Sequence, residues 1–306
     1  MKNFIVKIII FFSGMALIDF TWGTLFKYLD THPKSEKEFN NQRISTKDFQ
    51  DIVILGSSRG KYHYIPQTIT DSTGYNCQNF SAFSQGIFHL YGRYLLISKL
   101  SNPKLIIYDI FNEYDINTEI DRLHYINELK PYIYETPKIR LYIEDIFPLE
   151  KYKMQSYLYL YNSDNAYGIL SRFRRNDTIP NKGFVAATGI LKNKDVSPMT
   201  YSQADTLKLA YISRLIDETR QKGSDIVFCI SPTYGEISSK SYQKFFELAK
   251  KKNITIFNHL MDKRITKNNK YFKDCVHLNK EGATLYSTII AHEIKEYLKH
   301  KENNKP

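Results

Sequence analysis

The segment DIVILGSSRG, residues 51–60, decides the fold of this chain. An aliphatic run leads into Gly56, and two serines and an arginine follow it. A short continuous apolar run that ends in a turn is typical of a buried strand of a parallel sheet. Ser57 and Ser58 therefore lie where the strand ends. Taken alone, they favour a role as caps of the next helix, since serine is a preferred N-cap residue; the alternative is that one is a nucleophile.

The remainder of the chain repeats this strand-and-helix rhythm. The predicted strands are Ile52–Leu55, Asn76–Phe80, Leu105–Asp109, Asp225–Ile230 and Thr255–Phe257. The predicted helices are Gly86–Leu100, Gln203–Lys222, Ser239–Lys252 and Lys280–His300. Strands that alternate with helices predict an α/β fold with a parallel sheet covered on both faces. Ligands of such sheets bind at the carboxyl ends of the strands, where the two serines lie.

Composition narrows the function classes. The chain has 306 residues, of which 42% are hydrophobic, enough for one large core. Its formal net charge of +11 is spread along the sequence, and it contains no zinc-finger or RNA-binding signature, so we expect no nucleic-acid partner. A diffuse basic surface fits an anionic membrane or an acidic polysaccharide, or serves solvation alone. Neither a phosphate-binding motif nor metal-ligand cysteine spacing is present, and we expect no cofactor and no metal.

The first thirty residues predict a membrane anchor. Lys2 and Lys7 flank an apolar stretch that is interrupted by Asp19 and resumes to Phe26. About 20 apolar residues span a bilayer, and no small-residue cleavage site follows, so residues 1–30 are predicted to be an uncleaved signal-anchor. The positive flank places the following domain outside the cytoplasm. The alternative is a buried amphipathic helix, because Asp19 would cost about 2.5–3.5 kcal/mol at mid-membrane.

Two further segments complete the predicted organisation. Residues 31–47 are polar and read as a linker, and residues 48–302 form the α/β domain. Residues 116–200 are rich in Tyr, Arg and Asn and break the rhythm, so they are predicted to be an insertion after the third strand. The insertion is either a lid or substrate platform over the strand ends or a structural excursion.

A base for a serine nucleophile is present near the C-terminus. In KDCVHLN, Asp274 precedes His277 by three residues, in a loop before the last helix. A carboxylate at this spacing can bond one ring nitrogen, fix the tautomer and leave the other nitrogen free as a base. His63 and His89 lie on predicted helices and His300 in a solvated tail, which makes His277 the informative histidine.

These two ends resemble the SGNH (GDSL-like) hydrolases. The turn Gly56-Ser57-Ser58 is similar to the family's first block, with Ser57 in place of its Asp, and DCVHLN to its last block. The resemblance implies a three-layer, flavodoxin-like, doubly wound parallel sheet. It implies Ser58 as nucleophile, His277 as base and Asp274 as the group that orients the base.

The match to the second and third blocks of the family is looser. The segment NFSAFSQGIF, residues 79–88, occupies the place of the second block, with Ser84 or Gly86 as its oxyanion donor. In IFNE, Asn112 matches the oxyanion asparagine of the third block, although the Gly and final Asp are missing. The resemblance thus implies an oxyanion hole built from Asn112, Gly86 and the backbone of Ser58. Arg59 departs from the commonest first block and either binds an anionic or sugar group of a substrate or pairs with a helix carboxylate.

The resulting hypothesis is a membrane-anchored serine esterase or O-acyl transferase. Its substrate would be an acyl ester, in particular one of a cell-envelope or extracellular glycan, because aromatic side chains stack on sugars. The alternative is a non-catalytic glycan-binding or assembly protein that retains the fold, an interpretation favoured by the loose middle blocks.

Overall fold

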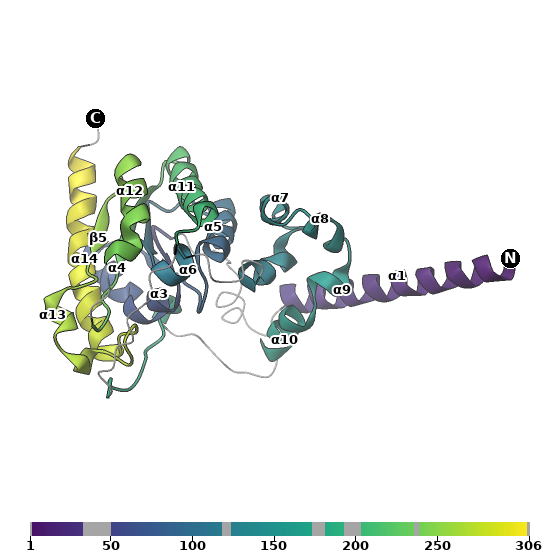
Figure 1. Ribbon diagram of the computed structural model, residues 1–306, viewed down its shortest axis with the longest axis horizontal. Coiled ribbons are helices and arrows are strands. Elements are labelled where there is room, and N and C mark those ends of the chain that lie inside the picture. The colour runs from purple at the N-terminus through teal and green to yellow at the C-terminus, as the bar shows by residue number, and fades with distance from the viewer. Residues whose placement is uncertain are drawn as a thin grey trace. The chain divides into compact units, whose positions relative to one another are not determined.

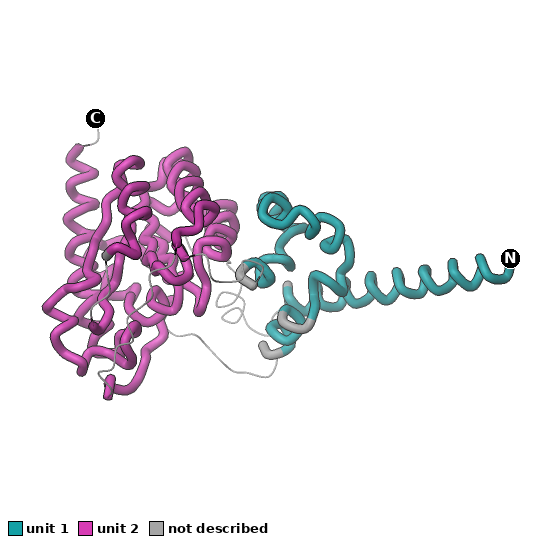
Figure 2. Tube along the Cα trace, in the orientation of Figure 1, with its two compact units in different colours: residues 1–45, 123–178 teal, residues 46–122, 179–306 magenta. Residues whose placement is uncertain are grey.

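The computed structural model describes residues 2–32, 50–117, 124–172, 181–192, 203–235 and 239–304. It divides into two compact units, which Figure 2 colours separately. Unit 1 comprises residues 1–45 and 123–178, and unit 2 comprises residues 46–122 and 179–306. The predicted linker, residues 31–47, lies almost wholly outside the described residues. The sequence placed the whole insertion with the α/β domain, whereas the structure groups residues 123–178 with the N-terminal helix.

Unit 2 is built on a five-stranded sheet of order β2-β1-β3-β4-β5, in which every pairing is parallel. The strands are β1 (Ile52–Gly56), β2 (Cys77–Asn79), β3 (Leu105–Asp109), β4 (Asp225–Ile230) and β5 (Ile256–Asn258). This is the flavodoxin-like strand order, and it confirms the predicted α/β fold. Each predicted strand is present within one residue of its expected limits. β1 and β3 are buried along their whole length, as expected of central strands covered on both faces.

Helices cover both faces of the sheet (Figure 1). The longer ones are α4 (Pro66–Thr73), α5 (Ile87–Leu100), α11 (Thr206–Gln221), α12 (Gln243–Lys251) and α14 (Lys280–Asn303). Residues of α4 and α14 join one face of β1, β3 and β4 in a single apolar cluster. On the other face, the Phe228 ring lies 5.3 Å from Tyr108 and 5.0 Å from Phe245 of α12. The Phe88 ring of α5 lies 5.7 Å from Tyr211 of α11.

Short elements fill the connections of unit 2. They are α3 (Ser58–His63), α6 (Asn112–Asp115), η2 (Asn181–Gly183), η3 (Ser239–Tyr242), α13 (Lys263–Thr266) and η4 (Asn269–Tyr271). The start of α14 is fixed by Asn279, whose Oδ1 accepts from the Gly282 N–H at 3.1 Å. Its Nδ2 also donates to the carbonyls of Gly189 and Lys270, at 2.9 and 2.6 Å. These bonds hold the chain directly after His277.

Unit 1 joins the long helix α1 (Lys2–Thr31) to the described part of the insertion. The other elements are η1 (His124–Tyr132), α7 (Pro137–Ile146), α8 (Glu150–Lys153), α9 (Tyr157–Leu160) and α10 (Ser163–Arg172). Its interior holds a buried ion pair, in which Lys130 Nζ lies 3.0 Å from Glu150 Oε2. Tyr159 donates to the same carboxylate at 2.7 Å and accepts from Lys130 at 2.8 Å. The pair is therefore hydrogen-bonded as well as charge-neutral, as a buried pair requires.

Candidate active site

Strand register brings the candidate residues to one edge of the sheet. Gly56 at the end of β1 pairs with Asp109 of β3, and Asp109 pairs with Cys229 of β4. Ser58 follows Gly56 by two residues and Asn112 follows Asp109 by three. The carboxyl ends of parallel strands meet at a common edge, so segments far apart in the sequence converge there.

Ser58, His277 and Asp274 form a continuous chain of hydrogen bonds. Ser58 Oγ lies 2.8 Å from His277 Nε2, and His277 Nδ1 lies 2.9 Å from both carboxylate oxygens of Asp274. Asp274 Oδ1 also accepts from the backbone N–H groups of Val276 and His277, at 3.0 and 2.9 Å. Partial burial raises the pKa of Asp274, but the bonds from His277 and the backbone outweigh it and lower that pKa below its ordinary value. The carboxylate is therefore ionised at neutral pH, and Nδ1 carries the proton that faces it.

The serine turn makes no side-chain cap. Ser57 is the N-cap residue of α3, yet its hydroxyl forms no cap bond with the backbone. Ser58 is the first residue of the helix, and its hydroxyl is directed to His277. The capping interpretation, favoured by the turn taken alone, therefore does not describe either hydroxyl.

Two of the predicted oxyanion residues, Asn112 and Gly86, lie in segments that pack against each other. Asn112 begins α6, is 1% exposed, and donates its backbone N–H to the Tyr242 hydroxyl at 3.4 Å. Gly86 precedes α5 and packs so closely on α6 that a Cβ there would lie 2.3 Å from the Tyr114 carbonyl oxygen. No side chain fits at position 86, which explains the glycine irrespective of any part in binding an oxyanion.

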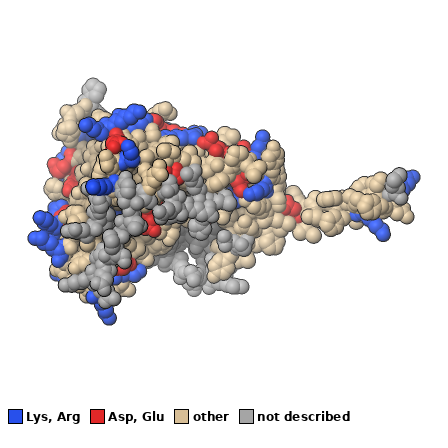
Figure 3. All heavy atoms as spheres, viewed as in Figure 1, with Lys and Arg blue, Asp and Glu red and all other residues tan. Residues whose placement is uncertain are grey.

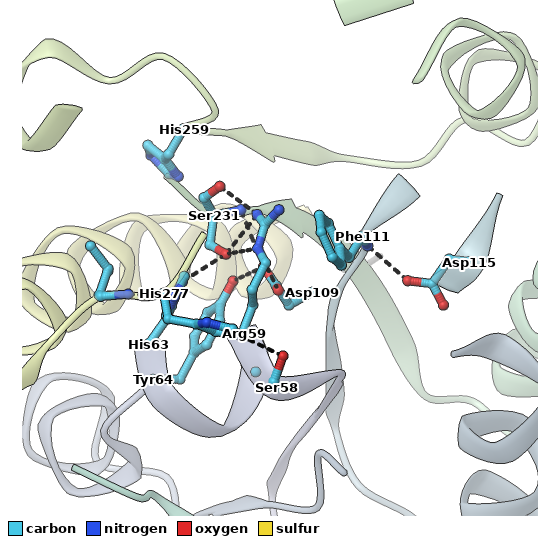
Figure 4. A network of polar contacts seen from close by, with 12 residues as sticks. Ser58, Arg59, His63, Tyr64, Asp109, Phe111, Asp115, Ser231, His259 and His277 are labelled. Atoms are coloured by element: carbon cyan, nitrogen blue, oxygen red, sulfur yellow. Dashed lines mark hydrogen bonds and ion pairs between the residues drawn. The ribbon is translucent and has the colours of Figure 1, made fainter. Parts of the chain in front are cut away.

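Arg59 lies in the protein interior (Figure 4). Its side chain is 0% exposed; Nε and Nη2 bond Ser231 Oγ at 2.9 and 2.8 Å, and Nη2 also bonds the Ser231 carbonyl. Nε lies 3.7 Å from Asp109 Oδ2, and the guanidinium stacks on Phe111 at 4.8 Å. Burial opposes the charge, but Asp109 raises the pKa of Arg59 above its ordinary value. Of the two roles considered for Arg59, this geometry matches pairing with a carboxylate, but the partner ends strand β3 and does not lie on a helix as predicted; the buried side chain leaves no surface for a substrate.

His63 links the serine helix to the loop of His277. Its Nε2 accepts from the Leu278 backbone N–H at 2.9 Å, so the ring proton is on Nδ1, which donates to Ser231 Oγ at 2.9 Å. Burial lowers the pKa of His63 well below its usual value, and Arg59 and His277 add to the effect. The ring is therefore neutral and held in one tautomer, and its partner Leu278 follows His277 directly in the sequence.

Sequence reasoning missed this buried polar layer. The strand pattern predicts Asp109 only as the last residue of a strand and gives no role to Ser231, although both lie at strand ends. Tyr64 donates to Asp109 Oδ1 at 2.7 Å, and the Ser231 N–H donates to the same oxygen at 3.2 Å. An aspartate that closes an aliphatic strand next to an Arg-bearing turn is the signal that could have found the pair.

An aromatic pair flanks the base. The Tyr62 ring lies 5.2 Å from the His277 ring in an edge-on arrangement and 5.2 Å from the Phe83 ring. Phe83 is 45% exposed and precedes Ser84, whose φ of 54° is in the left-handed region. Glu113 belongs to the same surroundings: partial burial raises the pKa of its carboxyl, and His277 opposes that rise.

Comparison with known proteins gives only distant structural likenesses. No family model matches the chain, and no curated protein matches it either. A protein assigned to the G-D-S-L lipolytic family from Desulfitobacterium hafniense has 12% identity and a TM-score of 0.41, over 79% of this chain and 98% of its own. A family two carbohydrate esterase from Clostridium thermocellum, solved with cellohexaose, has 10% identity and a TM-score of 0.42, over 83% and 66%. A GDSL-like lipase from Bacteroides thetaiotaomicron has 12% identity and a TM-score of 0.38, over 80% and 88%.

The chain is thus similar to solved structures of GDSL-type lipolytic and esterase proteins.

Proposed function

We propose that this protein is an SGNH-type serine esterase or O-acyl transferase that acts through Ser58, His277 and Asp274. One observation supports this above the others, namely the distance of 2.8 Å between Ser58 Oγ and His277 Nε2, with Asp274 on the opposite ring nitrogen. A serine hydroxyl is a weak nucleophile until a positioned base removes its proton, and this arrangement supplies that base.

The reaction follows the geometry. Ser58 Oγ attacks the ester carbonyl while its proton passes to His277 Nε2. The imidazolium is stabilised by Asp274, and the tetrahedral oxyanion accepts bonds from Asn112 and from the backbone N–H groups of Ser58 and Gly86. His277 returns the proton to the leaving alcohol, and the acyl group stays on Ser58. Water then releases the acid, or a sugar hydroxyl takes the acyl group, with His277 again as base.

A glycan ester is the substrate class we infer. The exposed Phe83 ring, with Tyr62 between it and His277, offers an aromatic face next to the reacting groups. Sugar rings pack their apolar faces on such side chains. Phe83→Ala should therefore raise the KM for an acetylated oligosaccharide and leave the KM for p-nitrophenyl acetate unchanged. Equal effects on both substrates would contradict a glycan platform at Phe83.

The anchor assignment follows from how α1 is used. The helix is long and apolar enough to cross a membrane, a property that signal sequences share. One face of its second half, however, packs within unit 1, because Phe26 is 3% exposed and stacks 6.0 Å from Tyr161. Cleavage after the apolar stretch would remove these contacts. We therefore infer an uncleaved single-pass anchor, with Lys2 and Lys7 on the cytoplasmic side and unit 2 outside.

A fluorophosphonate probe tests the catalytic proposal in the full-length protein. The wild type should be labelled, and Ser58→Ala and His277→Ala should not. Ser57→Ala is the matched control, since it removes the neighbouring hydroxyl, which forms no cap bond, and should be labelled like the wild type. Labelling that survives in Ser58→Ala would refute the assigned nucleophile.

The second candidate is a non-catalytic glycan-binding or assembly protein. The departures from the family's middle blocks favour it, since Ile110 and Glu113 stand where a Gly and an Asp are expected. A folded wild type that binds an acetylated glycan but neither reacts with the probe nor turns over an ester would establish this alternative.

A further inference from the structure

The exposed apolar stretch of α1 that ends before Asp19 is too short to cross a bilayer by itself, although the whole helix is long enough. Large apolar side chains from Phe4 to Ile18 are 40% or more exposed, and Asp19 follows them directly. At about 1.5 Å per residue this stretch covers about 22 Å, whereas the hydrocarbon core is about 30 Å thick. Figure 3 shows the protruding part of the helix as almost free of charge, with basic residues toward its tip. Something beyond Asp19 has to complete the span.

The insertion supplies hydrogen-bond donors to the Asp19 carboxylate. Its Oδ1 accepts from Ser156 Oγ at 2.6 Å and from the Leu158 N–H at 2.8 Å, and its Oδ2 accepts from the Tyr157 N–H at 2.9 Å. A carboxylate that is fully hydrogen-bonded within the protein loses much less on leaving water than a bare one does. In an isolated helix, the Asp19 charge would stay at the membrane surface and end the embedded segment. With its carboxylate hydrogen-bonded to the insertion, Asp19 does not set that limit in this protein.

The following helical turns of α1 are clamped to α9. Gly23 lies so close to the Tyr157 ring that a Cβ would be 2.2 Å from it, so only glycine permits this approach. Trp22 Nε1 donates to the Tyr161 carbonyl at 3.1 Å. The helix α1 and α9 thus form one rigid element directly after Asp19, where the exposed apolar stretch of α1 ends.

Apolar side chains remain exposed around this element. We define the apolar collar as five residues of α1, α9 and α10 with exposed fractions between 41% and 68%, namely Phe20, Leu25, Leu158, Tyr167 and Leu170. Both α9 and α10 pack on α1. Trp22, 36% exposed, lies at the same level, and indole rings prefer the membrane interface.

We propose that the apolar collar enters the outer layer of the bilayer and lengthens the anchor, so that unit 1 is embedded at the membrane surface. The proposal rests on the inferred anchor and is independent of the catalytic assignment. Its occupant is lipid, because the collar continues the apolar surface of α1 past Asp19, whose carboxylate is hydrogen-bonded within the protein.

Trp22 is the only tryptophan of the chain and reports on this directly. The full-length protein is placed in phosphatidylcholine vesicles whose acyl chains carry bromine near the headgroup end or near the bilayer centre. We expect bromine near the headgroup end to quench Trp22 fluorescence most and aqueous iodide to quench it little. In the Leu158→Glu variant, bromine near the headgroup end should quench Trp22 little and aqueous iodide should quench it strongly. Leu141→Glu is the matched control, since Leu141 is 65% exposed on α7, which packs on η1 and α8, and it should leave both unchanged.

The outcomes separate the two proposals. Extraction of the protein by alkaline carbonate would overturn the anchor and the collar together. Resistance to extraction with Trp22 open to iodide and unquenched by bromine would retain the anchor and overturn the collar. Cross-linking between cysteines introduced at Leu158 in two copies, with Trp22 unquenched by lipid, would assign the collar to a second copy of the chain.

Discussion

Replacement of Asp274 by Asn should abolish most of the activity while leaving the fold intact. Oδ1 of Asp274 holds two backbone N–H groups, Val276 and His277, and only an oxygen can accept from both. The amide oxygen of Asn must therefore take this position, which places the amide NH2 at the Oδ2 position, 2.9 Å from His277 Nδ1. Nδ1 then lies 2.9 Å from both the amide oxygen and the NH2 group, so the side chain no longer holds the ring proton on Nδ1 as a carboxylate does, and the tautomer with the proton on Nε2 becomes populated. That nitrogen faces Ser58 and can then no longer accept its proton.

The expected loss in kcat is about 10⁴-fold, as for the same exchange in a serine protease triad, or about 5.4 kcal/mol. Stability should change by about 1 kcal/mol or less, because both backbone bonds survive. The assay is p-nitrophenyl acetate turnover together with the rate of fluorophosphonate labelling, with circular dichroism as the check on folding. Asp262→Asn is the control, since Asp262 accepts from the Arg264 N–H in a similar turn and its carboxylate bonds the Arg264 side chain in place of a histidine ring. A folded Asp274→Asn variant that keeps more than about a tenth of the wild-type kcat would refute the tautomer argument.

Three further predictions concern the buried polar layer. Arg59→Met should destabilise unit 2 by about 3–5 kcal/mol in urea unfolding, because it leaves the buried Asp109 carboxylate without its cation. Combining Arg59→Met with Asp109→Leu should recover part of that loss. Additive losses in the double variant would argue against a coupled pair. His63→Phe should lower kcat about 10–10² fold with little change in KM or in the pH profile. His63→Gln keeps an acceptor for the Leu278 N–H and should retain more activity. Equal losses in the two variants would contradict a positioning role. Burial raises the pKa of Asp115 to about 7, so the folded state holds a proton that the unfolded state releases near pH 4. The stabilisation from this group is complete below about pH 4 and is lost as pH rises through about 7. Asp115→Asn should therefore flatten the fall in unfolding free energy between these pH values. An unchanged slope would show that another group titrates there.

The sheet could be predicted because its signals are local. Each strand is a short continuous aliphatic run, and such runs have few alternatives in a chain that alternates strand and helix. Ser58 and His277 could be predicted for a related reason, since each lies in a short segment with a recognisable neighbour pattern at a strand end or a helix start. Their distance of 2.8 Å could not, because it depends on how α14 packs on the sheet.

The surroundings of Arg59 and the contacts made by the insertion were harder to predict, because both depend on residues that are remote in sequence. Arg59 is buried because Ser231, 172 residues later, supplies acceptors for its guanidinium. Asp19 appears in the sequence only as a cost to membrane insertion, and its partners at Ser156 and Leu158 are 137 and 139 residues away. A single sequence shows the charge in each case but not the group that compensates for it.

The helix α3 explains why activity and stability should be difficult to separate in this protein. Six residues contain the hydroxyl of Ser58, the cation of Arg59 and the ring of His63. Arg59 and His63 both bond Ser231 at the end of β4, and His63 also bonds the Leu278 N–H next to His277. Since a helix this short moves as one body, any shift of the buried pair also moves the hydroxyl relative to its base. The charges buried at the strand ends therefore position the reacting atoms as well as hold the strands together.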